Sequence, residues 1–206
     1  MPATPSPSPS PEPAEPGEGV KLLERADLAR RLDLVRLSRQ IVFTNGCFDL
    51  LHVGHVRLLQ QARRCGDLLV VGVNSDRSVR QLKGPARPVV RDAERAEILA
   101  ALACVDYVVI FDEDTPVETL RVLRPHIHVK GGDYRPEDLP ERATLAELGA
   151  RLEIFPLVPG RSTTRLLENA TQAGDEPSHE SPSHEGPCER SGISTSRDPE
   201  DGGPGG

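Results

Sequence analysis

Five short apolar runs constrain the fold of this chain more than any other feature of its sequence. They alternate with longer amphipathic segments and have the sequences IVFT (41–44), LLVVGV (68–73), VDYVVIF (105–111), IHVK (127–130) and LEIF (152–155). Strands without a polar face are buried on both sides, as in a parallel sheet that helices cover on each face. The sequence therefore predicts an α/β fold, a single Rossmann-like doubly wound domain with a five-stranded parallel sheet.

The segments between these runs predict the covering helices. Apolar residues recur at helical spacing in the segments 21–37, 53–62, 91–102, 115–123, 139–148 and 162–168. We expect one or two amphipathic helices in 21–37. Asp114 or Thr115 is expected to cap the helix at 115–123, with Pro116 in its first turn.

The two ends differ in composition from the rest of the 206 residues. Residues 1–19 alternate Pro with Ser, Ala and Glu, and residues 171–206 consist largely of Gly, Pro, Ser, Glu and His. Segments of this kind bury too little apolar surface to fold, so we expect both to be disordered. Residues 20–170 are then predicted to form the only folded domain.

The net charge of −7 belongs to these ends, which carry −3 and −6 and leave +2 for residues 20–170. A slightly basic domain without a basic stripe does not predict a nucleic-acid partner. The sequence has no apolar run long enough to span a membrane and no secretory signal, so no membrane partner is expected. Its four cysteines lack CxxC spacing, which favours a reducing cytoplasm.

The segment 44–55, TNGCFDLLHVGH, follows the first apolar run. In α/β sheets ligands bind beyond the carboxyl ends of the strands, where helix N-termini attract anions. Gly46 would allow a tight turn there, and both Gly46 and Gly54 would let a ligand approach the backbone closely. His52 and His55 stand three residues apart, so both can face one ligand and donate hydrogen bonds to phosphate oxygens.

Other interpretations of this segment stay open from the residues alone. The two histidines could hold a metal ion, although no third ligand has an obvious local place. They could also be ordinary cap and core histidines. Cys47 could be a nucleophile, but the sequence shows no His–Asp pair that would activate it.

The segment GCFDLLHVGH resembles the HxGH signature of the cytidylyltransferase-like nucleotidyltransferase superfamily, which includes the glycerol-3-phosphate cytidylyltransferases. Within it, residues 21–170 are most similar to the heptose 1-phosphate adenylyltransferase domain of ADP-heptose synthase. The segments that carry this closer resemblance are FTNGCFDLLHVGH, VGVNSD with LKGPARPV, VKGGDY and GRSTT. Cys47 agrees with it, because many relatives in the superfamily carry Thr or Ser at this position, whereas the heptose branch usually has Cys.

The resemblance implies transfer of AMP from ATP to a sugar 1-phosphate, heptose 1-phosphate, which yields ADP-heptose and pyrophosphate. His52, His55 and Lys83 would be catalytic, with Lys83 reaching a phosphate from a loop. The implied nucleotide-binding residues are Thr44, Asn45, Gly46, Cys47, Phe48, Gly54, Asn74, Asp76, Lys130, Gly131, Asp133, Arg161, Ser162, Thr163 and Thr164. Without the resemblance, Lys83 and Arg87 would be ordinary solvated residues.

Two of these motifs also have a physical rationale. Glycines after the run 127–130 would let a nucleotide lie against the backbone, with Asp133 accepting hydrogen bonds; a plain glycine turn is the alternative. The hydroxyls of 161–164 would open a helix and form a second phosphate cradle, although many helices begin with such residues.

The resemblance also implies partners. Mg²⁺ would bridge the phosphates, held by substrate oxygens and water rather than by dedicated protein ligands. We expect a homodimer, and a separate sugar kinase that supplies the sugar 1-phosphate, because relatives are often fused to one. Three alternatives remain: a cytidylyltransferase acting on glycerol 3-phosphate or another alcohol phosphate, a non-enzymatic nucleotide-binding module, and an interaction protein that works through its tails.

Overall fold

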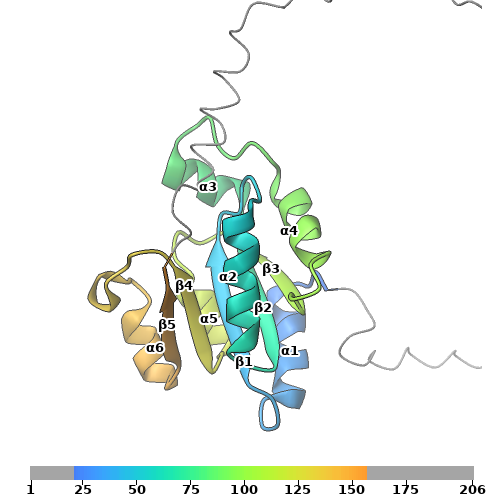
Figure 1. The fold of residues 1–206 in the computed structure, drawn as a ribbon, viewed down its shortest axis with the longest axis vertical. Helices are drawn as coiled ribbons and strands as arrows, with labels where there is room; N and C mark the ends of the chain where they lie inside the picture. The colour runs from blue at the N-terminus through green and yellow to red at the C-terminus, as the bar shows by residue number, and fades with distance from the viewer. Residues whose placement is uncertain (1–20, 157–206) are drawn as a thin grey trace, which may run out of the picture.

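The computed structural model describes residues 21–156 of the chain. A sheet of five parallel strands lies at its centre (Figure 1). Its order is β3-β2-β1-β4-β5, and the strands are β1 (Ile41–Gly46), β2 (Leu68–Asn74), β3 (Tyr107–Phe111), β4 (Ile127–Gly131) and β5 (Arg151–Phe155). This confirms the prediction of a Rossmann-like α/β fold with a five-stranded parallel sheet.

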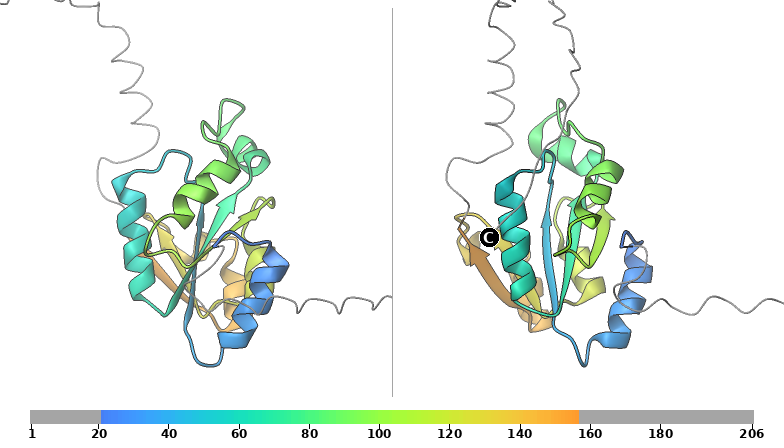
Figure 2. Two further views of the ribbon diagram at one scale, coloured as in Figure 1. Left: turned by 90° about the vertical axis from the view of Figure 1, so that its right-hand side faces the viewer. Right: turned by 45° about the vertical axis from the view of Figure 1, so that its right-hand side comes forward.

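Helices cover both faces of the sheet (Figure 2). One face packs against α2 (Val53–Arg64) and α4 (Asp92–Ala100), and their inward residues include Leu59 and Leu99. The other face packs against α1 (Arg25–Val35), α5 (Val117–Leu123) and α6 (Arg142–Leu148). All seven residues of β2 are buried, as expected for a strand in the middle of a covered parallel sheet.

The sequence prediction missed one helix, α3 (Asp76–Lys83), and placed Lys83 in a loop. Lys83 is instead the last residue of this helix, and Gly84 follows it with φ 94°. Ser75 caps the helix by accepting a hydrogen bond from the N–H of Ser78 at 3.1 Å. Val79 is the only buried apolar residue of α3, so the helical period of its sequence is weak.

Three predicted boundaries also move. Residues 21–24 are not helical, because Leu22 forms a bridge with Val108 of β3 and α1 starts only after Glu24. Pro116 is itself the N-cap of α5. A short 3₁₀ helix, η1 (Pro136–Asp138), precedes α6, which begins at Arg142.

The predicted disordered ends and the predicted helix at 162–168 lie outside the described residues. Within 21–156, no helix is long and apolar enough to cross a membrane.

The strand order reverses between β1 and β4, because the chain winds one way from β1 through β2 to β3 and the other way through β4 to β5. The carboxyl ends of two such strands open a crevice between them, which is where ligands bind in folds of this class. Thr44 pairs with Val129, so the next residues, Asn45 and Lys130, stand at the mouth of this crevice.

Candidate active site

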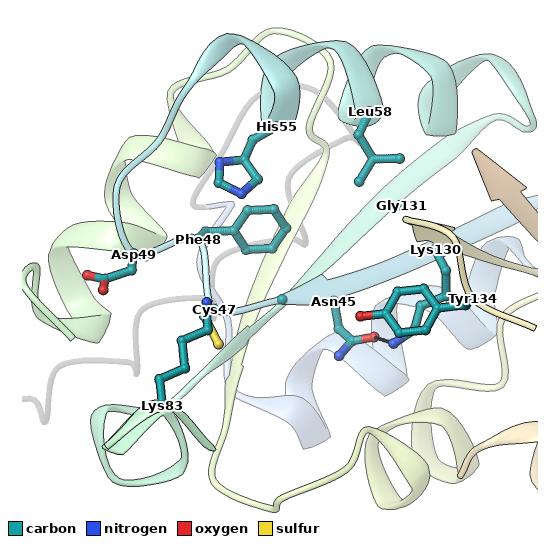
Figure 3. Close-up of a pocket in the computed structure, with 11 residues that line it drawn as sticks. Asn45, Cys47, Phe48, Asp49, His55, Leu58, Lys83, Lys130, Gly131 and Tyr134 are labelled. Carbon is teal, nitrogen blue, oxygen red and sulfur yellow. Dashed lines mark hydrogen bonds between the residues drawn. The ribbon is translucent and has the colours of Figure 1, made fainter. Parts of the chain in front are cut away.

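A cavity of about 250 Å³ lies at this crevice (Figure 3). The structure brings together eight of the predicted site residues in its wall: Asn45, Gly46, Cys47, Phe48, His55, Lys83, Lys130 and Gly131. Three lining residues were not predicted: Asp49, Leu58 and Tyr134. Asp49 and Tyr134 belong to the GCFD and VKGGDY motifs, which were the available signals, whereas Leu58 had none beyond its place on a helix.

The two histidines build the first turn of α2. His52 is the N-cap, and its Nδ1 accepts a hydrogen bond from the N–H of Gly54 at 3.1 Å. Nδ1 of His55 accepts from the N–H of His52 at 3.4 Å, and the two rings stack with centroids 3.8 Å apart. An accepting Nδ1 places the proton of a neutral imidazole on Nε2. His55 therefore offers an Nε2–H donor to the cavity that it lines.

The pKa of His55 is lowered to about 4, first by burial and then by the neighbouring His52 and Lys83. At neutral pH His55 is thus an uncharged hydrogen-bond donor. Its ring is oriented by the hydrogen bond that Nδ1 accepts from the N–H of His52 in the capping box.

This lowered pKa predicts a pH-dependent stability. In the unfolded chain His55 is protonated below about pH 6.5, whereas in the folded protein it is protonated only near pH 4. The free energy of unfolding therefore falls as the pH falls through this window. A His55→Gln variant cannot titrate there, and between pH 7 and 4 it should lose about 1–3 kcal/mol less free energy of unfolding than the wild type. Urea unfolding at several pH values measures the difference. Parallel pH curves for the two proteins would contradict it.

The GCFD turn owes its shape to Phe48, the residue with positive φ (46°). Its buried ring packs edge-on against His55, with centroids 5.2 Å apart. A Cβ at Gly46 would come within 3.2 Å of the same ring. The positive φ of the turn is therefore at Phe48 and not at Gly46, where the tight turn was expected, and the glycine instead makes room for the Phe48 ring.

Asp49 ties this turn to the loop between α3 and α4. Its Oδ1 accepts hydrogen bonds from the N–H groups of Val89 at 2.7 Å and Val90 at 3.1 Å. Its Oδ2 lies 2.5 Å from Nε of Arg87 in a buried ion pair. Arg87 is therefore not the solvated residue that it would be by default, since only 13% of its side chain is exposed.

Cys47 and Lys83 face the same cavity. Burial raises the pKa of the Cys47 thiol despite the opposing charges of Lys83 and Arg95. The thiol therefore stays protonated at neutral pH, which is unfavourable for a nucleophile. Lys83 is exposed at the end of α3 and projects toward Cys47 (Figure 3).

The remaining predicted residues lie elsewhere. Thr44 is buried within β1, the Nδ2 group of Asn74 donates to Oγ of Ser78, and the Asp76 carboxylate binds Arg95. Asp133 is exposed and does not line the cavity. His52 and Gly54 lie at the N-terminus of α2 but are not among the residues that line the cavity, and residues 161–164 lie outside the described residues. The roles of all the predicted site residues stay predictions.

The sequence of this chain was compared with those of known protein families and proteins. The cytidylyltransferase-like family matches residues 43–169. The "Bifunctional protein HldE" of Syntrophotalea carbinolica is 61% identical over 133 residues, which are 65% of this chain and 27% of that protein. The protein of the same name from Trichlorobacter lovleyi is 55% identical over 135 residues, 66% of this chain and 28% of the relative. The chain thus spans about a quarter of the length of these curated relatives.

Solved structures are also similar, and two of them serve as examples. A lipopolysaccharide core biosynthesis protein from Thermoplasma volcanium is 25% identical with a TM-score of 0.50, over 59% of this chain and 98% of that one. Pantothenate synthetase from Thermus thermophilus, at 16% identity and a TM-score of 0.55 over 75% and 71% of the two chains, shares the fold. The fold, the paired histidines and the family match agree, and the chain belongs to the cytidylyltransferase-like family.

Proposed function

We propose that this protein transfers AMP from ATP to a sugar 1-phosphate, heptose 1-phosphate, and thereby forms ADP-heptose and pyrophosphate. The observation that carries the proposal is one cavity at the β1–β4 crevice where His55, Lys83 and Lys130 converge. High identity to the HldE proteins over the same region supports the heptose branch.

In the proposed reaction, an oxygen of the sugar phosphate attacks the α-phosphorus of ATP in line. A new P–O bond forms, the bond to the β-phosphate breaks, and pyrophosphate leaves with the electron pair. No covalent enzyme intermediate is needed, so the protein acts by positioning and by stabilising charge. The α2 N-terminus and the Nε2–H of His55 would donate to the oxygens of the reacting phosphate, where negative charge grows in the transition state.

Other residues complete the proposed site. The Lys83 ammonium, which can turn into the cavity from the end of α3, would bind the α-phosphate or the sugar phosphate. Ser162 and Thr163 would hold the β- and γ-phosphates, as the resemblance implies.

Mg²⁺ belongs to the proposal as a companion of ATP. The carboxylate that lines the cavity is that of Asp49, which already accepts two backbone hydrogen bonds and pairs with Arg87. In residues 21–156, no group of three or more His, Cys, Asp and Glu could hold a metal ion. Mg²⁺ would therefore be held by phosphate oxygens and water, and it would supply neutralisation of the phosphate charge.

The proposal also covers the assembly, the location and the source of the substrate. We propose a homodimer in the cytoplasm, a separate kinase that supplies the sugar 1-phosphate, and residues 20–170 as the functional unit. A fragment of residues 20–170 should then retain the activity of the full chain.

The deciding experiment is pyrophosphate release by the purified protein with Mg²⁺, in which ATP and CTP are each combined with heptose 1-phosphate and glycerol 3-phosphate. Release only with ATP and heptose 1-phosphate would support the proposal. Release with CTP and glycerol 3-phosphate would replace it with a cytidylyltransferase that uses the same geometry. No release from any pair, together with measurable ATP binding, would favour a nucleotide-binding module.

A Cys47→Ser variant should keep kcat within about threefold of the wild type. The proposed in-line transfer needs no nucleophilic side chain, and the raised pKa of this thiol disfavours one. Steady-state pyrophosphate release measures the effect. A loss of a thousandfold or more would instead indicate a covalent intermediate on Cys47.

A further inference from the structure

Lys130 lines the cavity, but its charge is already compensated by the protein. Its Nζ lies 2.9 Å from Oε1 of Glu141, the residue that precedes α6. The Glu141 side chain is 1% exposed, and the sequence analysis did not single it out. A buried carboxylate beside the proposed site therefore has a role that the mechanism above does not explain.

The second partner of Glu141 holds it in place without adding charge. Nε2 of His128 lies 3.1 Å from the same Oε1, and the His128 ring is fully buried and stacked on Phe43 with centroids 5.6 Å apart. Burial lowers the pKa of His128, so the ring is neutral and donates a hydrogen bond. Lys130 is then the cation that balances Glu141.

The electrostatics of the pair agree with this geometry. Burial alone raises the pKa of Glu141, but the hydrogen bond from His128 and the charge of Lys130 outweigh it and lower the pKa to about 2. Glu141 is thus ionised at neutral pH. A buried ionised carboxylate is costly unless it is paired, which ties the position of Lys130 to that of Glu141.

The same ammonium also contacts the mouth of the cavity. Nζ of Lys130 donates to Oδ1 of Asn45 at 3.1 Å (Figure 3). An ammonium has three donors, and Glu141 and Asn45 take two of them. In the part of the chain that the structure describes, the third N–H has no hydrogen-bond acceptor, and the ring of Tyr134 lies beside the ammonium with its centroid 5.8 Å from Nζ. Since Oδ1 of Asn45 is occupied, the side-chain NH₂ is what Asn45 can offer a ligand.

The remaining donors of Lys130 and Asn45 fit a phosphate oxygen. We propose that Glu141 is a positioning residue: its buried carboxylate fixes the Lys130 ammonium beside Asn45, so that the remaining donor of Lys130 binds a phosphate oxygen of a substrate. This inference rests on the proposed function. The neutral Lys130–Glu141 pair supplies direction, whereas Lys83 supplies net charge. The phosphate belongs either to ATP or to the sugar phosphate.

A double-mutant cycle on the full chain tests the inference. Calorimetry measures the Kd of ATP and of heptose 1-phosphate for the wild type, Glu141→Gln, Lys130→Met and the double variant. Each single change should weaken one of the two ligands by about tenfold or more, and that ligand identifies the source of the phosphate. In the Lys130→Met background, Glu141→Gln should change Kd by less than about twofold, because its effect passes through Lys130.

Two further variants separate this role from a structural one. Glu141→Asp keeps the charge but is one methylene shorter, and it should reproduce the effect of Glu141→Gln in a chain whose folding is less affected. Glu147→Gln is the same chemical change on α6 at an exposed residue, 3.9 Å from Arg121, and should leave both Kd values within about twofold of the wild type.

The possible results are distinct. Equal weakening by Glu141→Gln in both backgrounds, or no weakening of either ligand, would overturn the role of Glu141. Coupled binding without pyrophosphate release would refute the proposed reaction and leave that role standing. Pyrophosphate release by the wild type, together with Kd values that Glu141→Gln does not change, would do the reverse, and a wild type that binds neither ligand would overturn both.

Discussion

Replacement of His55 by Ala should lower kcat by at least about a hundredfold, a loss of about 2.7 kcal/mol of transition-state stabilisation. The side chain offers its Nε2–H to the cavity from the N-terminus of α2, where a phosphate that gains negative charge would lie. Because the interaction strengthens in the transition state, the loss should fall on kcat more than on the KM of ATP. Steady-state pyrophosphate release measures both.

The type of replacement separates a neutral donor from a cation. The low pKa of His55 makes it an uncharged donor at neutral pH, and a Gln side chain can place an N–H group in a similar position. His55→Gln should therefore lose less activity than His55→Ala. His126→Ala is the matched control, since that ring hydrogen-bonds the N–H of Ile41 at the opposite end of β1. Near-normal turnover of His55→Ala in a folded protein would refute the role.

The sheet could be predicted from the sequence because its inner strands, above all the fully buried β2, are apolar on both faces, a pattern that few other folds require; the edge strand β5 carries Arg151 and Glu153 and shows this pattern less clearly. The histidines could be placed because one local segment holds both the strand end and the helix start. Glu141 could not. It is one acid among several in 137–141, and its contact with Lys130 exists only after this segment has folded back beside β4.

Contacts between distant segments also kept Arg95 from being predicted, although its guanidinium donates to the carbonyl oxygen of Cys47 in the GCFD turn. Arg95 was counted only as part of a predicted helix, although its side chain is completely buried. Arginine is seldom buried without partners, but sequence cannot show which partners those are. They come from three separate segments, 47, 74–76 and 90, that meet only when α4 packs on the sheet. The sequence therefore predicted most of the residues that line the cavity and missed the buried arginine that contacts the turn.

Replacement of Arg95 by Met should cost about 3–5 kcal/mol of the free energy of unfolding. The guanidinium donates to the carbonyl oxygens of Cys47, Asn74 and Val90 and pairs with Oδ1 of Asp76 at 2.8 Å. Its removal takes the nearest cation from the Asp76 carboxylate, which keeps the N–H of Asp92 at 2.8 Å, and takes a donor from each of the three carbonyls. Urea unfolding at 10–25 °C measures the loss. It should be easy to detect, because the total free energy of unfolding of a small domain is only about 5–15 kcal/mol.

Arg77→Met is the matched control for this change. Arg77 also pairs with an aspartate, with its Nε 2.8 Å from Asp112, but 59% of its side chain is exposed. Exposed ion pairs contribute little, so Arg77→Met should cost less than about 1 kcal/mol. Equal losses in the two variants would show that the Arg95 network stabilises the fold no more than a surface pair does. A large loss confined to Arg95→Met would mean that the hydrogen bonds from α4 to Cys47 and Asn74 stabilise the domain, although this helix contributes no side chain to the wall of the cavity.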